Sequence, residues 1–119
     1  MSIASRIVNA VSFAGLPCVQ VSFNGDADTY FVFNLQAVPS AFADDAPEAD
    51  IWLIQLHLYA PFTLDTTKLR RKVRNAIHEA GFTYPDMQDA SSGIRSTDGT
   101  EQHIVFEFED ATGVGDDDD

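Results

Sequence analysis

The sequence has one cysteine and only seven basic residues in 119. A single Cys18 cannot form a disulfide within the chain, which fits a reducing compartment. Long apolar runs are also missing: the most apolar stretch, 51–59, is interrupted by Gln55 and His57, whereas a membrane-spanning helix needs about 20 apolar residues. Arg6 breaks the first apolar stretch, so no secretory signal is readable. We therefore expect no membrane partner.

The shortage of basic residues leaves nineteen acidic ones in large excess, with a formal charge of −12. Four of these charges belong to Asp116 to Asp119, which follow a Gly-Val-Gly sequence. We expect residues 112–119 to be a disordered acidic tail, following a single domain over residues 1–111. An acidic domain is a poor general nucleic-acid binder, because phosphate neutralisation supplies most of that affinity.

Motifs of catalysis and cofactor binding are missing as well. The chain has no Gly-rich phosphate loop, no His-Glu-x-x-His helix and no paired cysteines with zinc spacing. Cys18 with His57 or His103 has the types of a nucleophile and its base, but a free cysteine is most often simply buried. The two histidines lack a third metal ligand. We expect no enzyme activity, no metal and no cofactor.

Hydrophobic periodicity predicts two helices and five strands. The first helix covers 3–14 and ends at Gly15, and the second begins near Asp65 and ends at Gly81, where a left-handed residue is typical. The strands are expected at 19–23, 29–36, 51–59, 82–87 and 103–109. Loops are expected at 39–50, which contains two prolines and several acidic residues, and at 91–100.

The order of these elements is α-β-β-β-α-β-β. Three long strands each have one aromatic or aliphatic face, and each helix has one apolar stripe, so each helix needs only one apolar partner. The pattern predicts an α+β fold: a two-layer sandwich of a mainly antiparallel sheet with both helices on one face.

The opposite sheet face is unusual for a solvated surface, because uncharged residues dominate it. The candidate contact residues on this face are Gln55, His57, Tyr59 and His103. Amphipathic side chains of this kind suit a surface that another chain partly buries. The alternative is that the loop 39–50 folds back over the face, and the sequence leaves both open.

The basic residues gather on the second helix, which carries five of the seven. The interface candidates are Lys68, Arg70, Arg71 and Arg74 on this helix and Asp44, Asp45 and Glu48 in the acidic loop. Patches of opposite sign on one monomer favour head-to-tail contacts, which close into rings when the rotation permits. We hypothesise that the helix meets the acidic loop of a neighbouring subunit. The alternative is an ordinary solvated helix face.

Four segments carry a resemblance to a known family. These are YFVFN (30–34), FADDAPEADIWLIQLHLYAP (42–61), LRRKVRNAIHEAGFTYPDMQDA (69–90) and QHIVFEFE (102–109). Their order, with an acidic loop between strands and a helix ending in AGF, resembles the tail terminator, or tail completion, proteins of long-tailed bacteriophages. The resemblance covers roughly residues 19–109 and rests on order and composition, with no catalytic signature.

The resemblance implies a structural virion protein that is found in the phage tail or neck after assembly in the host cytoplasm. It would form a ring, typically a hexamer of itself, that stops tail-tube polymerisation and joins the tube protein to the head-tail connector. DNA would pass through without specific binding, and we expect the basic helix to face a neighbour or the outside. The alternatives are another neck, connector or baseplate ring component, or a small ligand-binding α+β module.

Overall fold

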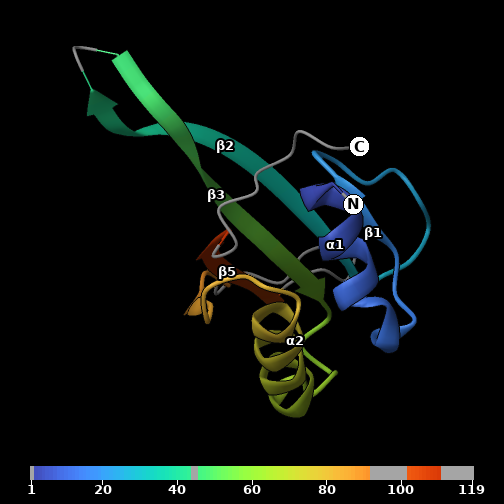
Figure 1. Cartoon of the computed structure of the whole chain (residues 1–119). Coiled ribbons are helices and arrows are strands. Elements are labelled where there is room, and N and C mark those ends of the chain that lie inside the picture. Colours follow the sequence, from blue (N-terminus) through green and yellow to red (C-terminus); the bar gives the residue numbers. More distant parts are fainter. Residues whose placement is uncertain (1, 44–45, 92–101, 111–119) are drawn as a thin grey trace.

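The computed structural model describes residues 2–43, 46–91 and 102–110, with backbone alone for 40–43 and 46–49. It is an α+β fold with two helices and a five-stranded mixed sheet in the order β1-β2-β3-β5-β4 (Figure 1). The elements in chain order are α1 (Ile3–Ala10), a 3-10 helix η1 (Ser12–Ala14), β1 (Cys18–Gln20), β2 (Tyr30–Ala43), β3 (Ala46–Ala60), α2 (Thr67–Glu79), β4 (Asp86–Asp89) and β5 (Gln102–Glu109).

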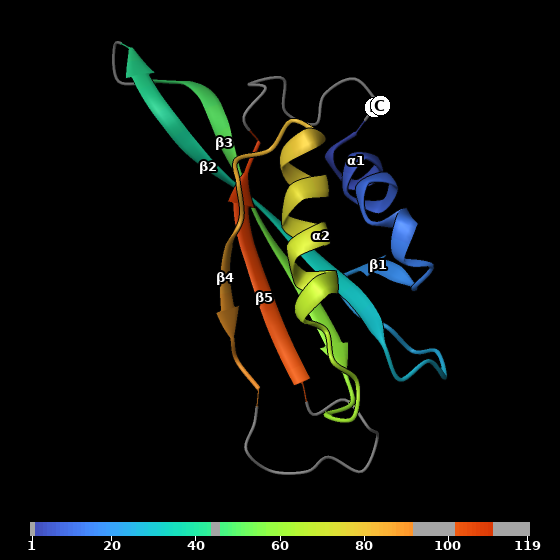
Figure 2. The ribbon, with the colours of Figure 1, turned by 90° about the horizontal axis from the view of Figure 1, so that it is seen from below.

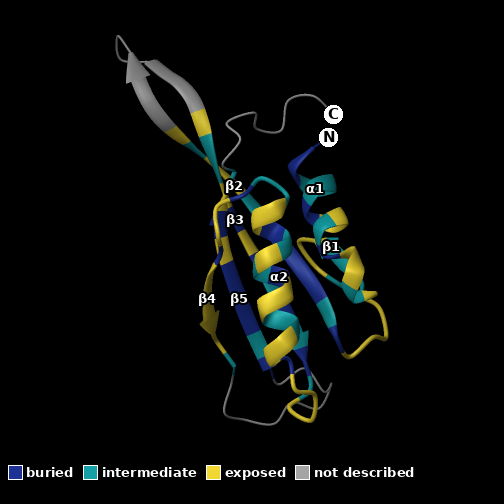
Figure 3. Ribbon diagram, turned by 60° about the horizontal axis from the view of Figure 1, so that its bottom comes forward, coloured by how far each residue is buried: buried dark blue, intermediate teal, exposed yellow. Residues whose placement is uncertain are grey.

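One face of the sheet, the inner face, forms the core with both helices. Cross-strand neighbours such as Phe33, Leu56 and Phe106 are almost completely buried on this face (Figure 3). The helices add apolar side chains to the same cluster, namely Ile3, Ile7 and Val11 from α1 and its C-cap, and Val73 and Ile77 from α2. Figure 2 shows α1 and α2 side by side along the sheet.

The predicted helix ends are largely confirmed. The Ser2 hydroxyl caps α1 by accepting a hydrogen bond from the Ser5 backbone N–H at 3.0 Å. Gly15 and Gly81 have positive φ values of 68° and 100°, as expected of residues that end helices. Asp65 accepts a hydrogen bond from the Thr67 N–H at the start of α2, which satisfies one of the free donors there.

The first strand is shorter than predicted and runs parallel to β2. The sequence predicts a strand to Phe23, but β1 ends at Gln20 because Val21 has a φ of 80°. The Ser22 N–H donates to the Gln20 carbonyl at 3.1 Å, so the chain turns sharply around Val21. A β-branched residue seldom adopts a positive φ. The hydrophobic periodicity of 19–23 therefore predicts a continuous strand and not a turn at Val21.

The prediction of a loop over 39–50 is wrong. Strands β2 and β3 continue through this segment as an antiparallel arm, paired as far as Ala43 and Ala46 (Figures 1 and 2). The arm contributes to the elongated shape, with principal extents of 53 × 27 × 25 Å. The backbone N–H of Phe31 and the carbonyl of Phe33 form hydrogen bonds on the β1 side of β2. Pro39 lies an even number of residues further along β2, so its nitrogen faces the same side, beyond the end of β1. A proline is tolerated there because the missing N–H removes no hydrogen bond between strands.

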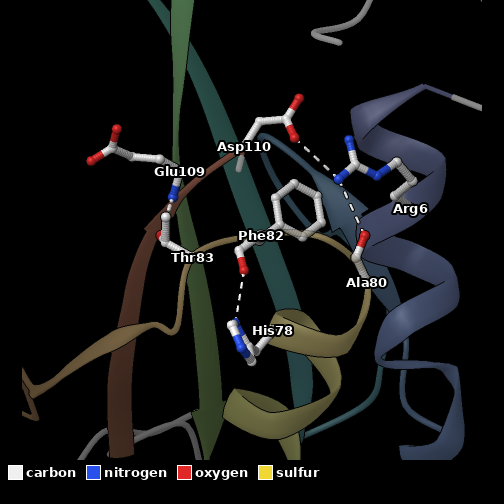
Figure 4. Close-up of polar contacts among 7 residues, drawn as sticks. All are labelled: Arg6, His78, Ala80, Phe82, Thr83, Glu109 and Asp110. Carbon is white, nitrogen blue, oxygen red and sulfur yellow. Dashed lines mark hydrogen bonds and ion pairs between the residues drawn. The ribbon is translucent and has the colours of Figure 1, made fainter. Parts of the chain in front are cut away.

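A partly buried ion pair connects the first helix to the end of the last strand (Figure 4). The Arg6 guanidinium donates to an Asp110 carboxylate oxygen at 3.1 Å and to the Ala80 carbonyl at 3.2 Å, at the C-terminal end of α2. It also lies over the Phe82 ring, 4.2 Å from the centroid. This arginine, which the sequence marks only as an interruption, connects three elements.

The predicted acidic tail at 112–119 and the predicted loop at 91–100, apart from Ser91, lie outside the described residues. The segment 82–87, expected as a strand, instead contains an isolated bridge at Phe82, and β4 begins at Asp86.

The core contacts predict a large difference between two leucines on β3. Leu56→Ala, at a fully buried position, should reduce the free energy of unfolding by about 2–5 kcal/mol, because it removes apolar contacts and leaves a cavity. Leu53→Ala, at a position 37% exposed on the opposite face, is the matched control and should cost under about 1 kcal/mol. Urea unfolding followed by circular dichroism measures both, and equal losses would contradict this assignment of faces.

Candidate functional site

The sheet face away from the helices, the outer face, carries an aromatic row. Strand pairing places Tyr30, Tyr59 and His103 side by side across β2, β3 and β5. Their rings stack, with centroids 5.2 Å apart for the tyrosines and 4.4 Å for Tyr59 and His103. Phe23 stacks on Tyr30 at 4.3 Å and extends the row at one end. Of the predicted contact residues, the structure brings Tyr59, His57 and His103 together, and Gln55 lies further along β3.

At the end of the row opposite Phe23, the imidazole of His103 contacts that of His57. His57 Nδ1 and His103 Nε2 are 2.8 Å apart, which is a hydrogen bond between one donor and one acceptor nitrogen. Burial lowers the pKa of both histidines below the ordinary 6.5, and for His57 the proximity of His103 lowers it further. Glu107 and Asp89 raise these pKa values by a smaller amount. The pair is therefore neutral at pH 7.

The ring orientation limits what this row can bind. Interplanar angles of 14–30° between these half-buried neighbours mean that each ring face is turned toward the next ring. Nucleic-acid-binding sheets use open ring faces on which bases stack. The stacked arrangement leaves edges outward instead, which suits contact with protein side chains.

Gly25 lies in close approach to the ring of Phe23. A Cβ atom at Gly25 would clash with the Phe23 ring. Gly25 therefore leaves space for Phe23 to stack on Tyr30.

The outer face becomes acidic toward its other end. Asp86 and Glu107 are register partners, and Glu109 follows two residues along β5 on the same face. All three are exposed and line an open hollow of about 650 Å³ with Gln55 and Leu53. Gln55 donates to the Glu107 carboxylate at 3.4 Å. The outer face thus changes from stacked rings at one end to carboxylates at the other.

The predicted basic patch divides into exposed and internally bonded residues. Lys68, Arg71 and Lys72 are exposed on the side of α2 that faces away from the sheet (Figure 3). Arg70 is half-buried: its guanidinium donates to Thr66 Oγ1 at 2.9 Å and to Gln102 Oε1 at 3.0 Å. Lys68, Arg71 and Lys72 are named here the basic face.

Arg74 is also held within the chain. Its Nε donates to the Pro85 carbonyl at 3.0 Å, and its guanidinium lies 4.7 Å from the Tyr84 ring centroid. Substitution of Arg74 would therefore disturb the connection between α2 and β4 as well as any outside contact. The acidic candidates Asp44 and Asp45, and the Glu48 side chain, lie outside the described residues.

Sequence reasoning missed Gln102, the buried amide that organises the start of α2. Its Nε2 donates to the carbonyls of Pro61 and Leu64, both at 2.6 Å, and its Oε1 accepts from Thr66 and Arg70. All the hydrogen-bonding groups of the amide are used, as a buried position requires. The only available signal was its place just before the alternating strand, which does not reveal distant partners.

The cysteine shows no activation as a nucleophile. Burial raises the pKa of Cys18 to about 11. Within the described residues, no three His, Cys, Asp or Glu side chains come together as metal ligands, and neither helix is long and apolar enough to cross a membrane.

Comparison with known proteins identifies no relative of the chain. No protein-family model matches the chain, and no curated protein matches it either. The functional argument therefore depends on the surfaces described above.

The raised pKa predicts a slow thiol. At pH 7 about one Cys18 thiol in 10⁴ is ionised, against a few per cent for a free cysteine, since each pKa unit changes the ratio tenfold. Alkylation of the folded protein by iodoacetamide should be roughly ten- to 100-fold slower than that of glutathione, because the greater nucleophilicity of a thiolate with a high pKa offsets part of its lower abundance. Urea-unfolded protein is the control and should react like glutathione. Labelling of the folded form as fast as that of glutathione would contradict the raised pKa.

The histidine pair predicts a loss of stability on mild acidification. Because folding lowers both pKa values, the unfolded chain binds more protons once the pH falls through 6.5, and the free energy of unfolding declines from there. The carboxylates with lowered pKa, Asp65 and Asp89, titrate only below about pH 4. Melting temperatures at pH 7.5 and 5.5 should differ clearly less in a His57→Gln/His103→Gln variant than in the wild type. An unchanged difference would rule out the pair as its source.

Proposed function

We propose that the protein is a tail terminator of a long-tailed bacteriophage. Its domain, a two-layer sandwich with both helices on one sheet face, would assemble as a homo-oligomeric ring of six at the head-proximal end of the tail tube. There it stops tube polymerisation and joins the tube to the head-tail connector. The protein works without turnover, cofactor or metal, and resides in the virion after assembly in the host cytoplasm.

One observation carries the proposal most directly: the surface is divided into complementary parts on opposite sides of the sheet. The basic face of α2 is exposed on one side, and the outer face carries a half-buried aromatic row and exposed carboxylates on the other. A surface of this kind favours contact between unlike faces of identical subunits, which is the contact that builds rings.

The arm of β2 and β3 supports the same reading. It extends beyond the parts of β2 and β3 that pair with β1 and β5, so it does not lie over the outer face, as the alternative from the sequence required (Figure 2). The described part of the arm therefore leaves the outer face available to a neighbouring chain. An acidic ring also suits a passage for DNA, because like charges oppose adhesion.

A ligand-binding module is the second candidate, and the hollow of about 650 Å³ is what favours it. The hollow is open, and three carboxylates and three amides share its lining with apolar residues such as Leu35 and Leu53. Small-molecule sites are instead mostly enclosed and apolar. The space between helices and sheet, where such a module would hold a ligand, is filled by the buried cluster. Assembly is thus the better supported function.

The test is to locate the protein in tail particles. Immunogold labelling of purified tails should mark only the head-proximal end, and tubes grown without the protein should exceed the normal length. Labelling at the distal end would favour a baseplate component, and absence from the particles would overturn the proposal.

A further inference from the structure

Two exposed surfaces of this chain match each other in charge. We propose that the basic face of α2 in one copy docks on the acidic end of the outer sheet face in the next copy. This inference rests on the proposed ring and names its contact: Lys68, Arg71 and Lys72 against Asp86, Glu107 and Glu109. It replaces the acidic loop as the partner of the basic helix.

The charges agree in number and spacing. Lys68, Arg71 and Lys72 are spaced i, i+3, i+4 along α2, so they lie within about 6 Å of one another along the axis. Glu107 and Glu109 are two residues apart on one strand, about 7 Å, and Asp86 lies beside Glu107 on the next strand, about 5 Å away. Three cations can therefore meet three carboxylates at once, and the open hollow between the carboxylates has room for long side chains.

The apolar surroundings favour the same contact. Leu53 is 37% exposed beside the carboxylates and is available for burial by the stems of docked lysine and arginine side chains. The neutral imidazoles and tyrosines further along the face can be covered without the cost of burying a charge.

The contact must be heterologous. The basic face and the carboxylates lie on opposite sides of the sheet, because α2 packs on the inner face and Glu107 points from the outer one. A two-fold pairing of outer faces would instead set the carboxylates of both copies against each other, which costs free energy. Each copy thus uses one surface on each side, and successive copies join head to tail, which closes into the proposed ring when the rotation between copies permits.

Cysteine cross-linking of the full chain tests this arrangement. In a Cys18→Ala background, Arg71→Cys combined with Glu107→Cys should give a ladder of disulfide-linked dimers, trimers and larger species on a non-reducing gel. The sheet stands between these two positions within one chain, beyond the reach of a disulfide, so only neighbouring copies can form the bond. The ladder should weaken as NaCl is raised from 50 to 500 mM.

Charge exchange provides the second measurement. Arg71→Glu should reduce the yield of copies cross-linked through Lys72→Cys and Glu109→Cys by roughly tenfold, and Glu107→Arg added to it should restore most of that yield. Arg71→Gln is the matched control and should have a smaller effect. Circular dichroism melts show whether each variant is folded, and both altered positions are exposed.

The outcomes separate this contact from the proposed function. Dimers formed equally well by Glu107→Cys alone would show two-fold pairing of outer faces and overturn the inference. Rescue of Arg71→Glu by Asp45→Lys, but not by Glu107→Arg, would assign the basic face to the acidic segment 44–48 predicted from the sequence and also overturn it. If the protein forms a ring at the end of tail particles but these cross-links do not form, the proposed function is supported and the proposed contact is wrong. A ladder from a protein absent from tail particles keeps the contact and removes the function.

Discussion

The packing of one apolar sheet face against two short helices is the constraint on which the rest of the structure depends. Phe33, Leu56 and Phe106 stand in adjacent strands on that face, and the stripes of α1 and α2 pack against it together with Phe82, which follows α2. Two helices of eight and thirteen residues suffice for one face only. The other face is therefore left to solvent or to a second chain, and its composition decides which of these applies.

Internal contacts also decide how much of the positive charge is free for a partner. Arg6, Arg70 and Arg74 each hold two or more elements of the fold together through hydrogen bonds to carbonyls, a carboxylate or a buried amide. What remains for an outside contact on α2 is a compact group of three cations. The acidic excess is spread more widely, so the sign of the net charge says little about where a contact forms.

Local periodicity was a good guide wherever an element has one buried side. The alternation in 30–36, 51–59 and 103–109 identified the three central strands, and the stripe ending at Gly81 identified α2. It failed for the arm, because a segment rich in proline and acidic residues is typical of a loop. The arm forms through the pairing of β2 with β3, which local periodicity does not reveal. The contact of His57 with His103 likewise follows from strand register over 46 residues, which the spacing of the two in the sequence does not reveal.

The Arg6–Asp110 pair has a consequence for the layout of the polypeptide. It joins the opening helix to the residue after the final strand, so both extremities of the folded unit leave from one corner (Figure 4). Any segment fused before or after the domain emerges there, beside the C-terminal end of α2 and away from the aromatic row. A short peptide bridge across this corner would permit the chain to be reopened elsewhere, since neighbouring ends are what circular permutation requires.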